Sequence, residues 1–248
     1  MTPLRFTVVI PARYEAERLP GKPLADIAGK PMIIWVYEAA RQSAAAEVIV
    51  ATDDERVAAV CRAARARVEL TAAHHASGTD RIAEVAARLA WQDDAIVVNV
   101  QGDEPLLPPR LIDQVAGLLE RHESAALATL VSPVRDAAEL ADPNVVKVAA
   151  DAAGYALYFS RAPIPYPRAG GLPDGARRHL GLYAYRAASL KILAAAPVCG
   201  LERAERLEQL RALWLGQRIA VADAWEAPPR GVDTEEDLAE ARRLVQLR

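Results

Sequence analysis

The chain has 248 residues, of which 52% are hydrophobic and 25% are charged, and its net charge is -3. That length and hydrophobic content suffice for an enzyme-sized α/β domain with its own core. Charges of both signs are mixed along the chain, without a polybasic tail or an acidic run, which argues against nucleic acid as a partner.

The first residues and the cysteines bear on the compartment. Residues 1–6 lead straight into a strand-like stretch and lack the features of a signal peptide. No uncharged apolar stretch reaches the roughly 18 residues that suggest a membrane span. Cys61 and Cys199 stand far apart, which is typical of buried thiols in a reducing compartment. We therefore expect a cytoplasmic protein without membrane insertion.

Strands and helices alternate through the first half of the chain. Continuous apolar runs predict buried strands at residues 7–10, 48–51, 68–70 and 95–100. Helices are predicted at about 31–43, from about 54, at 81–89 and after 109. This alternation predicts crossover units, a mostly parallel sheet, and ligands at the carboxyl ends of its strands.

The pattern changes after about residue 125. Strand-like pieces at 127–134, 145–149 and 155–159 follow one another without a long helix between them, which indicates an inserted antiparallel layer. A loop is predicted at 163–173, and helices are predicted at 201–215 and 234–247. No linker divides the chain, so we predict one domain over residues 1–248.

Three cations, Arg13, Arg18 and Lys22, lie in the loop directly after the first predicted strand. Glycine and proline let such a loop bend, so that backbone N–H groups and Lys22 can converge on phosphate oxygens. A solvated basic loop is the alternative for any one of these cations. The loop lacks the glycine fingerprint that a nicotinamide-dependent dehydrogenase needs at this point.

Two aspartates are candidate metal ligands. Asp103 follows the most hydrophobic strand, beside a glycine that permits close ligand approach. Magnesium prefers one or two carboxylates together with phosphate oxygens and water, so Asp103 suits it. Asp233 is a candidate for the second carboxylate, although its local sequence favours a cap of the last predicted helix.

Residues 77–81 open a predicted helix, and their hydroxyls and backbone donors suit either a pyrimidine edge or a simple N-cap. The neighbouring His74 and His75 lack a spaced partner for a metal site and are interpreted as loop histidines.

Three later segments, at 158–161, 178–183 and 207–211, combine an apolar frame with polar tips. Arginine can bind a carboxylate through two parallel N–H bonds, and the other polar groups can bind hydroxyls. The residue types alone favour a core or interface position for His179 and Tyr183.

These motifs resemble those of the bacterial CMP-Kdo synthetases over essentially the whole chain. The most specific are Leu-Pro-Gly-Lys-Pro-Leu at 19–24, Gly-Asp-Glu-Pro at 102–105 and Gly-Val-Asp-Thr at 231–234. The resemblance implies a Rossmann-like α/β fold of the nucleotide-diphosphosugar-transferase type. It also implies transfer of CMP from CTP to 3-deoxy-manno-octulosonate (Kdo) with release of pyrophosphate, for lipopolysaccharide synthesis in a Gram-negative bacterium.

The same resemblance assigns roles along the chain. It implies a nucleotide-binding part at about 1–124 and 216–248, and a sugar-binding part at about 125–215 that also forms a homodimer. Catalysis is assigned to Arg13, Lys22, Asp103 and Asp233, with Mg²⁺ held by the two aspartates. The nucleotide contacts are Pro11, Ala12, Arg13, Arg18, Lys22, Ser77, Gly78, Arg81, Gln101 and Asp103. The Kdo contacts are Arg161, His179, Tyr183, Glu208 and Gln209.

One departure from the family pattern keeps two alternatives open. Where the family usually has Ala-Ser-Thr-Arg, this chain has Glu15-Ala16-Glu17-Arg18. Missing hydroxyls and an anionic Glu17 beside a triphosphate predict weaker binding, unless the glutamates point to solvent. The alternatives are a cytidylyltransferase for another sugar acid, such as sialic acid or 8-amino-Kdo, and a CTP-binding regulatory protein without activity.

Overall fold

The first half of the protein alternates strands and helices, as the sequence predicts. The structure is a computed structural model that describes residues 4–15, 19–75 and 77–247. The elements of this half are β1 (Phe6–Ala12), α1 (Met32–Arg41), β4 (Glu47–Thr52), α2 (Glu55–Ala63), β5 (Arg67–Leu70), α3 (Gly78–Arg88), β6 (Ile96–Asn99) and α4 (Pro109–Arg121). Between β1 and α1 lie the short helix η1 (Lys22–Leu24) and a hairpin of β2 (Asp26–Ile27) and β3 (Lys30–Pro31).

The second half contains the predicted strands and several elements that the sequence patterns did not reveal. The predicted strands are β7 (Leu127–Pro133), β8 (Lys147–Ala150) and β9 (Ala156–Ser160), with α5 (Ala137–Ala141) after β7. The additional elements are β10 (Arg177–Arg186), α6 (Ala187–Ala195) and β11 (Ile219–Asp223). The last helix, α9 (Glu235–Gln246), lies within one residue of its predicted bounds at each end.

One predicted helix, over residues 201–215, is two helices in the structure. They are α7 (Gly200–Glu205) and α8 (Gln209–Trp214), and Arg206 between them has a left-handed backbone with φ 53°. The prediction of one continuous helix is therefore wrong, because a residue with positive φ cannot continue a right-handed helix.

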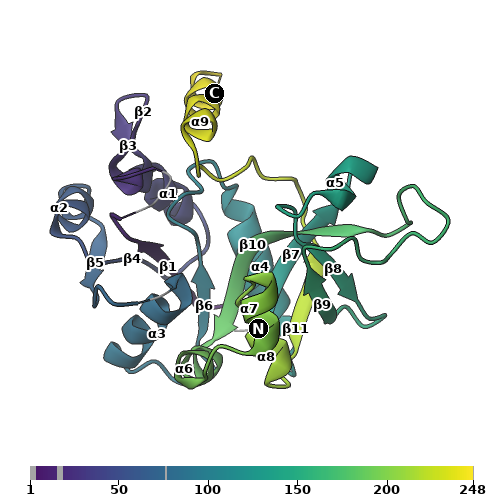
Figure 1. The fold of residues 1–248 in the computed structure, drawn as a ribbon. Coiled ribbons are helices and arrows are strands. Elements are labelled where there is room, and N and C mark those ends of the chain that lie inside the picture. Colours follow the sequence, from purple (N-terminus) through teal and green to yellow (C-terminus); the bar gives the residue numbers. More distant parts are fainter. Residues whose placement is uncertain (1–3, 16–18, 76, 248) are drawn as a thin grey trace.

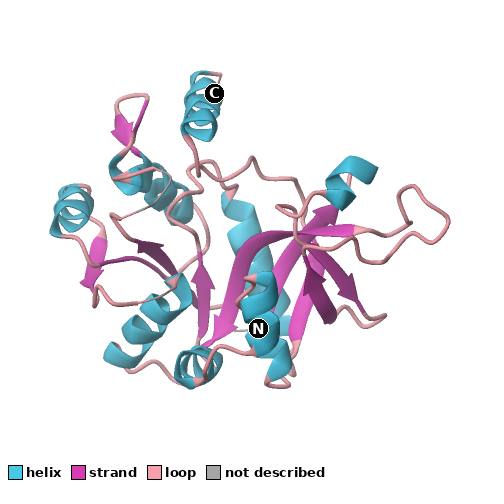
Figure 2. Cartoon of the chain, viewed as in Figure 1, coloured by secondary structure: helices cyan, strands magenta, loops and turns pink. Residues whose placement is uncertain are grey.

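The main sheet is mostly parallel, with a small antiparallel extension (Figures 1 and 2). Its strand order is β11-β7-β10-β6-β1-β4-β5, and only β10 runs against its neighbours along this described path. β8 joins β10, and β9 joins β8, both antiparallel. This arrangement confirms the predicted fold class.

Helices cover both faces of the sheet, which explains the continuous apolar runs of its strands. Phe6, Val8 and Ile10 of β1 pack on one face in a cluster with α1, α2 and α4. Val9 packs on the other face with α3, α6 and α8. The carboxyl ends of β1 and β6 lead into the polar loops that contain Arg13 and Asp103.

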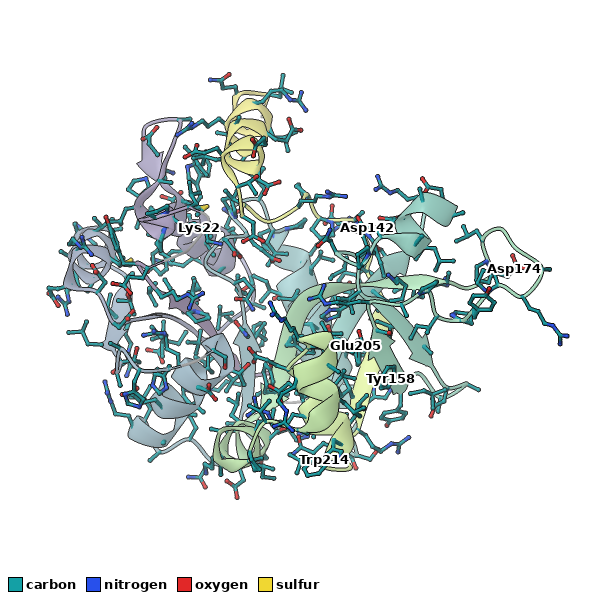
Figure 3. The ribbon with its side chains drawn as sticks, in the orientation of Figure 1. Lys22, Asp142, Tyr158, Asp174, Glu205 and Trp214 are labelled. Atoms are coloured by element: carbon teal, nitrogen blue, oxygen red, sulfur yellow. The ribbon has the colours of Figure 1, made fainter. Side chains whose placement is uncertain are left out.

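Two segments lie apart from these layers. α9 packs against the β2–β3 hairpin through a small cluster that includes Ile27 and Leu238. The long loop between β9 and β10, which includes Asp174, extends away from the rest of the chain (Figures 1 and 3). Within the described ranges, no helix is both long and apolar enough to cross a membrane.

Candidate active site

A polar cavity of about 370 Å³ opens at the carboxyl ends of β1 and β6. It is the meeting point of the loops that the sequence singled out. Its lining residues are Pro11, Ala12, Arg13, Leu19, Lys22, Pro23, His75, Ser77, Gly78, Arg81, Gln101, Gly102, Asp103, Glu208 and Asp233. Every predicted nucleotide contact lines this cavity except Arg18, which lies outside the described residues.

Lys22 joins the two predicted metal ligands. Its Nζ donates to Asp103 Oδ2 at 2.6 Å and to Asp233 Oδ1 at 3.0 Å. Figure 3 shows Lys22 below the helix α9 that follows Asp233. Burial alone would lower the pKa of Lys22, but the charges and hydrogen bonds of the two aspartates outweigh it and raise this pKa. The ammonium is therefore charged and holds both carboxylates at one point of the cavity wall.

Close backbone contacts fix the loop that carries Asp103. A Cβ atom on Gly102 would lie 2.9 Å from the carbonyl oxygen of Pro11, so glycine is needed where the two loops meet. The amide of Val232 donates to the carbonyl oxygen of Asp103 at 2.8 Å. A backbone hydrogen bond thus joins the loop that carries Asp103 to the segment that carries Asp233.

At the start of α9, the helix cap is made by a residue other than Asp233. Thr234 is the N-cap, and its side chain accepts the Asp237 amide in a capping box. The carboxylate of Asp237 in turn accepts the amide of Asp233 at 3.0 Å. The cap therefore comes from Thr234, and the Asp233 carboxylate is directed to Lys22.

The start of α3 forms another wall of the cavity. Ser77 is its N-cap and accepts the Asp80 amide at 3.1 Å. A Cβ atom on Gly78 would lie 3.2 Å from Pro11 Cγ, so α3 approaches the β1 loop closely. Arg81 is 3% exposed, donates to Thr71 and pairs with Asp53 at 3.2 Å. These contacts fix Arg81 at the back of the cavity.

His75 and Glu104 are two further features near the cavity. His75, interpreted from the sequence as a loop residue, lines the cavity and bonds to Glu84 of α3. Burial, and then the charge of Asp103, raise the pKa of Glu104 to about 8. Glu104 therefore adds little negative charge at neutral pH, beside two carboxylates in a cavity that is predicted to bind a polyanion.

The predicted Kdo contacts divide into two groups. Glu208 lines the cavity, and Gln209 lies beside it at the start of α8, lining a much smaller space. His179 and Tyr183 of β10 lie outside the cavity lining. Arg161 also lies outside it, because its guanidinium donates to the carbonyl oxygens of Glu205 at 2.7 Å and Pro143 at 2.8 Å.

Two of these residues carry buried polar atoms without a hydrogen-bond partner among the described residues. They are the Tyr183 hydroxyl and the Gln209 amide nitrogen. Such groups are costly in an apolar interior and are found where a water or ligand completes them. His179, by contrast, accepts the Gly181 amide at Nε2, and burial lowers its pKa to about 3. It is therefore neutral.

The structure describes only part of the loop in which this chain departs from the family pattern. Glu15 is exposed, whereas the departure at Ala16 and Glu17 lies outside the described residues. Gly21 lies close to the beginning of the loop, because its amide donates to the carbonyl oxygen of Tyr14 at 3.2 Å.

A mostly parallel sheet with a polar cavity at the carboxyl ends of its strands is typical of the α/β proteins that bind ligands at this edge. Comparisons with known proteins narrow this class. A family model described as cytidylyltransferase matches residues 7–219. The chain belongs to the cytidylyltransferases and, within them, to the family of the 3-deoxy-manno-octulosonate cytidylyltransferases.

The relatives match over nearly their whole length. The 3-deoxy-manno-octulosonate cytidylyltransferase of Pseudomonas fluorescens is 58% identical, over 97% of this chain and 98% of the relative. That of Thioalkalivibrio sulfidiphilus is 54% identical, over 98% and 100%. A solved structure of CMP:2-keto-3-deoxy-manno-octonic acid synthetase complexed with CTP is 42% identical, with a TM-score of 0.90 over 98% of each chain.

Proposed function

We propose that this protein transfers CMP from CTP to Kdo and releases pyrophosphate. The observation that carries this proposal is the charged Lys22 at the wall of a polar cavity, bonded to Asp103 and Asp233. A cation in that place suits a triphosphate, and the family of the chain supports CTP and Kdo as the substrates.

The proposed reaction is an in-line attack by the anomeric hydroxyl of Kdo on the α-phosphorus of CTP. The bond between the α-phosphorus and the bridging oxygen breaks, pyrophosphate leaves with that electron pair, and the hydroxyl proton passes to solvent. Positioning and charge neutralisation dominate such transfers. Arg13 and Lys22 neutralise charge on the phosphate oxygens, while Ser77, Gly78 and Arg81 hold the nucleotide from the α3 side.

The donor set near Lys22 fits magnesium. Among the described residues, no three His, Cys, Asp or Glu side chains form a preformed metal cage. Magnesium rarely needs one, since it is bound by one or two carboxylates together with substrate phosphates and water. Asp103 and Asp233 would hold it, and it would supply further charge for the phosphate oxygens.

The remaining assignments are part of the same proposal. Glu208 and Gln209 bind hydroxyls of the sugar acid, and Arg161, His179 and Tyr183 complete its site. Residues 125–215 also form the contact between two copies of the chain. The product is consumed in cytoplasmic synthesis of lipopolysaccharide.

The acceptor is tested by comparing turnover with Kdo, 8-amino-Kdo and sialic acid at equal concentration, with CTP and Mg²⁺. We expect the highest kcat/KM with Kdo. A higher kcat/KM with either of the other acids would reassign the acceptor and leave the cytidylyl transfer in place.

A further inference from the structure

Hydrogen bonds from the first residues of α3 connect the nucleotide side of the cavity to Glu208 on the predicted sugar side. Thr79 lies in the first turn of α3, next to Ser77 and Gly78 of the cavity wall. Its hydroxyl donates to Glu208 Oε2 at 2.9 Å, although the two residues are 129 positions apart in sequence. The sequence pattern offers the hydroxyls of residues 77–81 to a pyrimidine edge or an N-cap, and it indicates no contact of Thr79 with the sugar side.

The Glu208 side chain does not cap the helix that follows it. Glu208 is the residue before α8, and its side chain makes no capping hydrogen bond to that helix. A glutamate side chain has several rotatable bonds, so an anchor is needed to keep its carboxylate at one place in the cavity. In the described structure the Thr79 hydroxyl provides the stronger anchor, and Ser77 adds a weaker one.

The surroundings of Glu208 make this anchor electrostatically useful. Burial raises the pKa of Glu208, and the charge of Asp80 raises it further. The hydrogen bonds from Thr79 and Ser77 and the charge of Arg211 act in the opposite direction and favour the carboxylate. A carboxylate accepts hydrogen bonds from hydroxyls, whereas a carboxylic acid competes with them as a donor.

We propose that Thr79 is a positioning residue for the acceptor, because it holds the Glu208 carboxylate where the hydroxyls of a sugar acid bind. This inference rests on the proposed function of the cavity. It predicts that a residue on the nucleotide-binding helix sets the affinity for the other substrate.

The test compares Thr79→Val, which removes the hydroxyl at nearly constant volume, with Thr79→Ser, which keeps it. A hydrogen bond to a charged group contributes about 1.5–3 kcal/mol, so we expect the KM for Kdo to rise roughly tenfold or more in Thr79→Val. The KM for CTP and the Tm should stay near wild type. Thr79→Ser should restore most of the Kdo affinity.

A double-mutant cycle separates positioning from a general effect on the fold. In a Glu208→Ala background, Thr79→Val should change the KM for Kdo less than about twofold, because the side chain that Thr79 anchors is already gone. An equal effect in both backgrounds would contradict the inference, as would a rise confined to the KM for CTP.

A second readout does not depend on turnover. Carboxyl NMR should show a higher Glu208 pKa in Thr79→Val than in Thr79→Ser, and an unchanged pKa would overturn the inference. A wild-type protein that transfers CMP to none of the three sugar acids would contradict the proposed function. A working enzyme whose Kdo KM is insensitive to Thr79→Val would contradict only the role of Thr79.

Discussion

At the scale of single residues, Lys22 occupies the position that the proposed magnesium ion would need. Its ammonium lies within 3.0 Å of carboxylate oxygens of both Asp103 and Asp233. Magnesium binds oxygen at about 2.0–2.1 Å, so it would need the same oxygens. Metal and nucleotide binding are then coupled, since a metal that takes the carboxylates releases Lys22 for phosphate.

If Lys22 and the metal compete, Lys22→Met should change turnover and metal affinity in opposite directions. Turnover should fall strongly because a phosphate contact is lost. Affinity for Mn²⁺ alone, measured by electron paramagnetic resonance without nucleotide, should rise roughly tenfold, because a charge-assisted hydrogen bond of at least about 1.5 kcal/mol no longer competes. Lys30→Met removes an exposed lysine paired with Glu38 and serves as control. Weaker Mn²⁺ binding in Lys22→Met would contradict this competition.

Gly102 offers a steric test of the backbone contact between the β1 and β6 loops. A methyl group there would lie 2.9 Å from the Pro11 carbonyl oxygen, so Gly102→Ala should reduce the free energy of unfolding by about 1–3 kcal/mol. It should also weaken CTP binding, because Asp103 moves with the loop. Gly200→Ala is the matched control, since a methyl group there meets no atom within 4 Å. Urea unfolding measures both variants, and equal stability would show that the loops separate without cost.

At the scale of elements, α7 and α8 are joined by a buried ion pair. Arg211 donates to Glu202 through Nε at 2.7 Å and Nη2 at 2.5 Å, and it also donates to the carbonyl oxygen of Leu193 in α6. Both side chains of the pair are less than 10% exposed. Arg211 therefore holds α8, which begins with Gln209, against α6 and α7.

Replacing one partner of the Arg211–Glu202 pair should lower the free energy of unfolding more than replacing both. Arg211→Met leaves Glu202 buried without its partner and should cost about 3–5 kcal/mol of unfolding free energy. The double variant Arg211→Met with Glu202→Leu should recover most of that loss. Arg243→Met in α9 breaks an exposed pair with Glu240 and should leave the free energy of unfolding nearly unchanged. Urea unfolding distinguishes these cases, and a double variant no more stable than Arg211→Met would argue against the ion-pair explanation.

β10 carries a group that makes stability depend on pH. Burial lowers the pKa of His179 to about 3, against about 6.5 in an unfolded chain. Between these values the unfolded state binds a proton that the folded state does not, so the free energy of unfolding falls as the pH drops below about 6.5.

Replacement of His179 should remove this dependence. Between pH 6.5 and pH 5 the wild type should lose about 2 kcal/mol more than His179→Gln, at about 1.36 kcal/mol per pH unit. Urea unfolding at both pH values measures the difference. An identical loss in both proteins would show that His179 becomes protonated in the folded state.

The elements differ in how well the sequence predicts them. The β1, β4 and β6 strands are continuous apolar runs, and α3, α4 and α9 have N-terminal signals, so local patterns locate them. The break at Arg206 is not predictable in this way, because a left-handed backbone is usually marked by glycine or asparagine. β10 begins with Arg177 and Arg178, whose charges mask a strand that is buried mainly at its other end.

At the scale of the whole molecule, parallel topology explains how much of the site is predictable. Arg13, Lys22, Ser77 and Asp103 all follow strands whose carboxyl ends meet at one edge, so chain order alone brings them together. Asp233 and Glu208 reach the cavity from later segments, and only family resemblance indicates them. Thr79 has no local signal, since its partner is distant in sequence.

The most direct test of the proposed reaction is pyrophosphate release from CTP and Mg²⁺, measured with and without freshly prepared Kdo. We predict release that requires Kdo and is largely lost in Asp103→Asn, although that variant keeps its fold. Near-normal release by Asp103→Asn would refute its role at the metal. Release without Kdo, or CTP binding without release with any sugar acid, would contradict the assignment of this protein as a Kdo cytidylyltransferase.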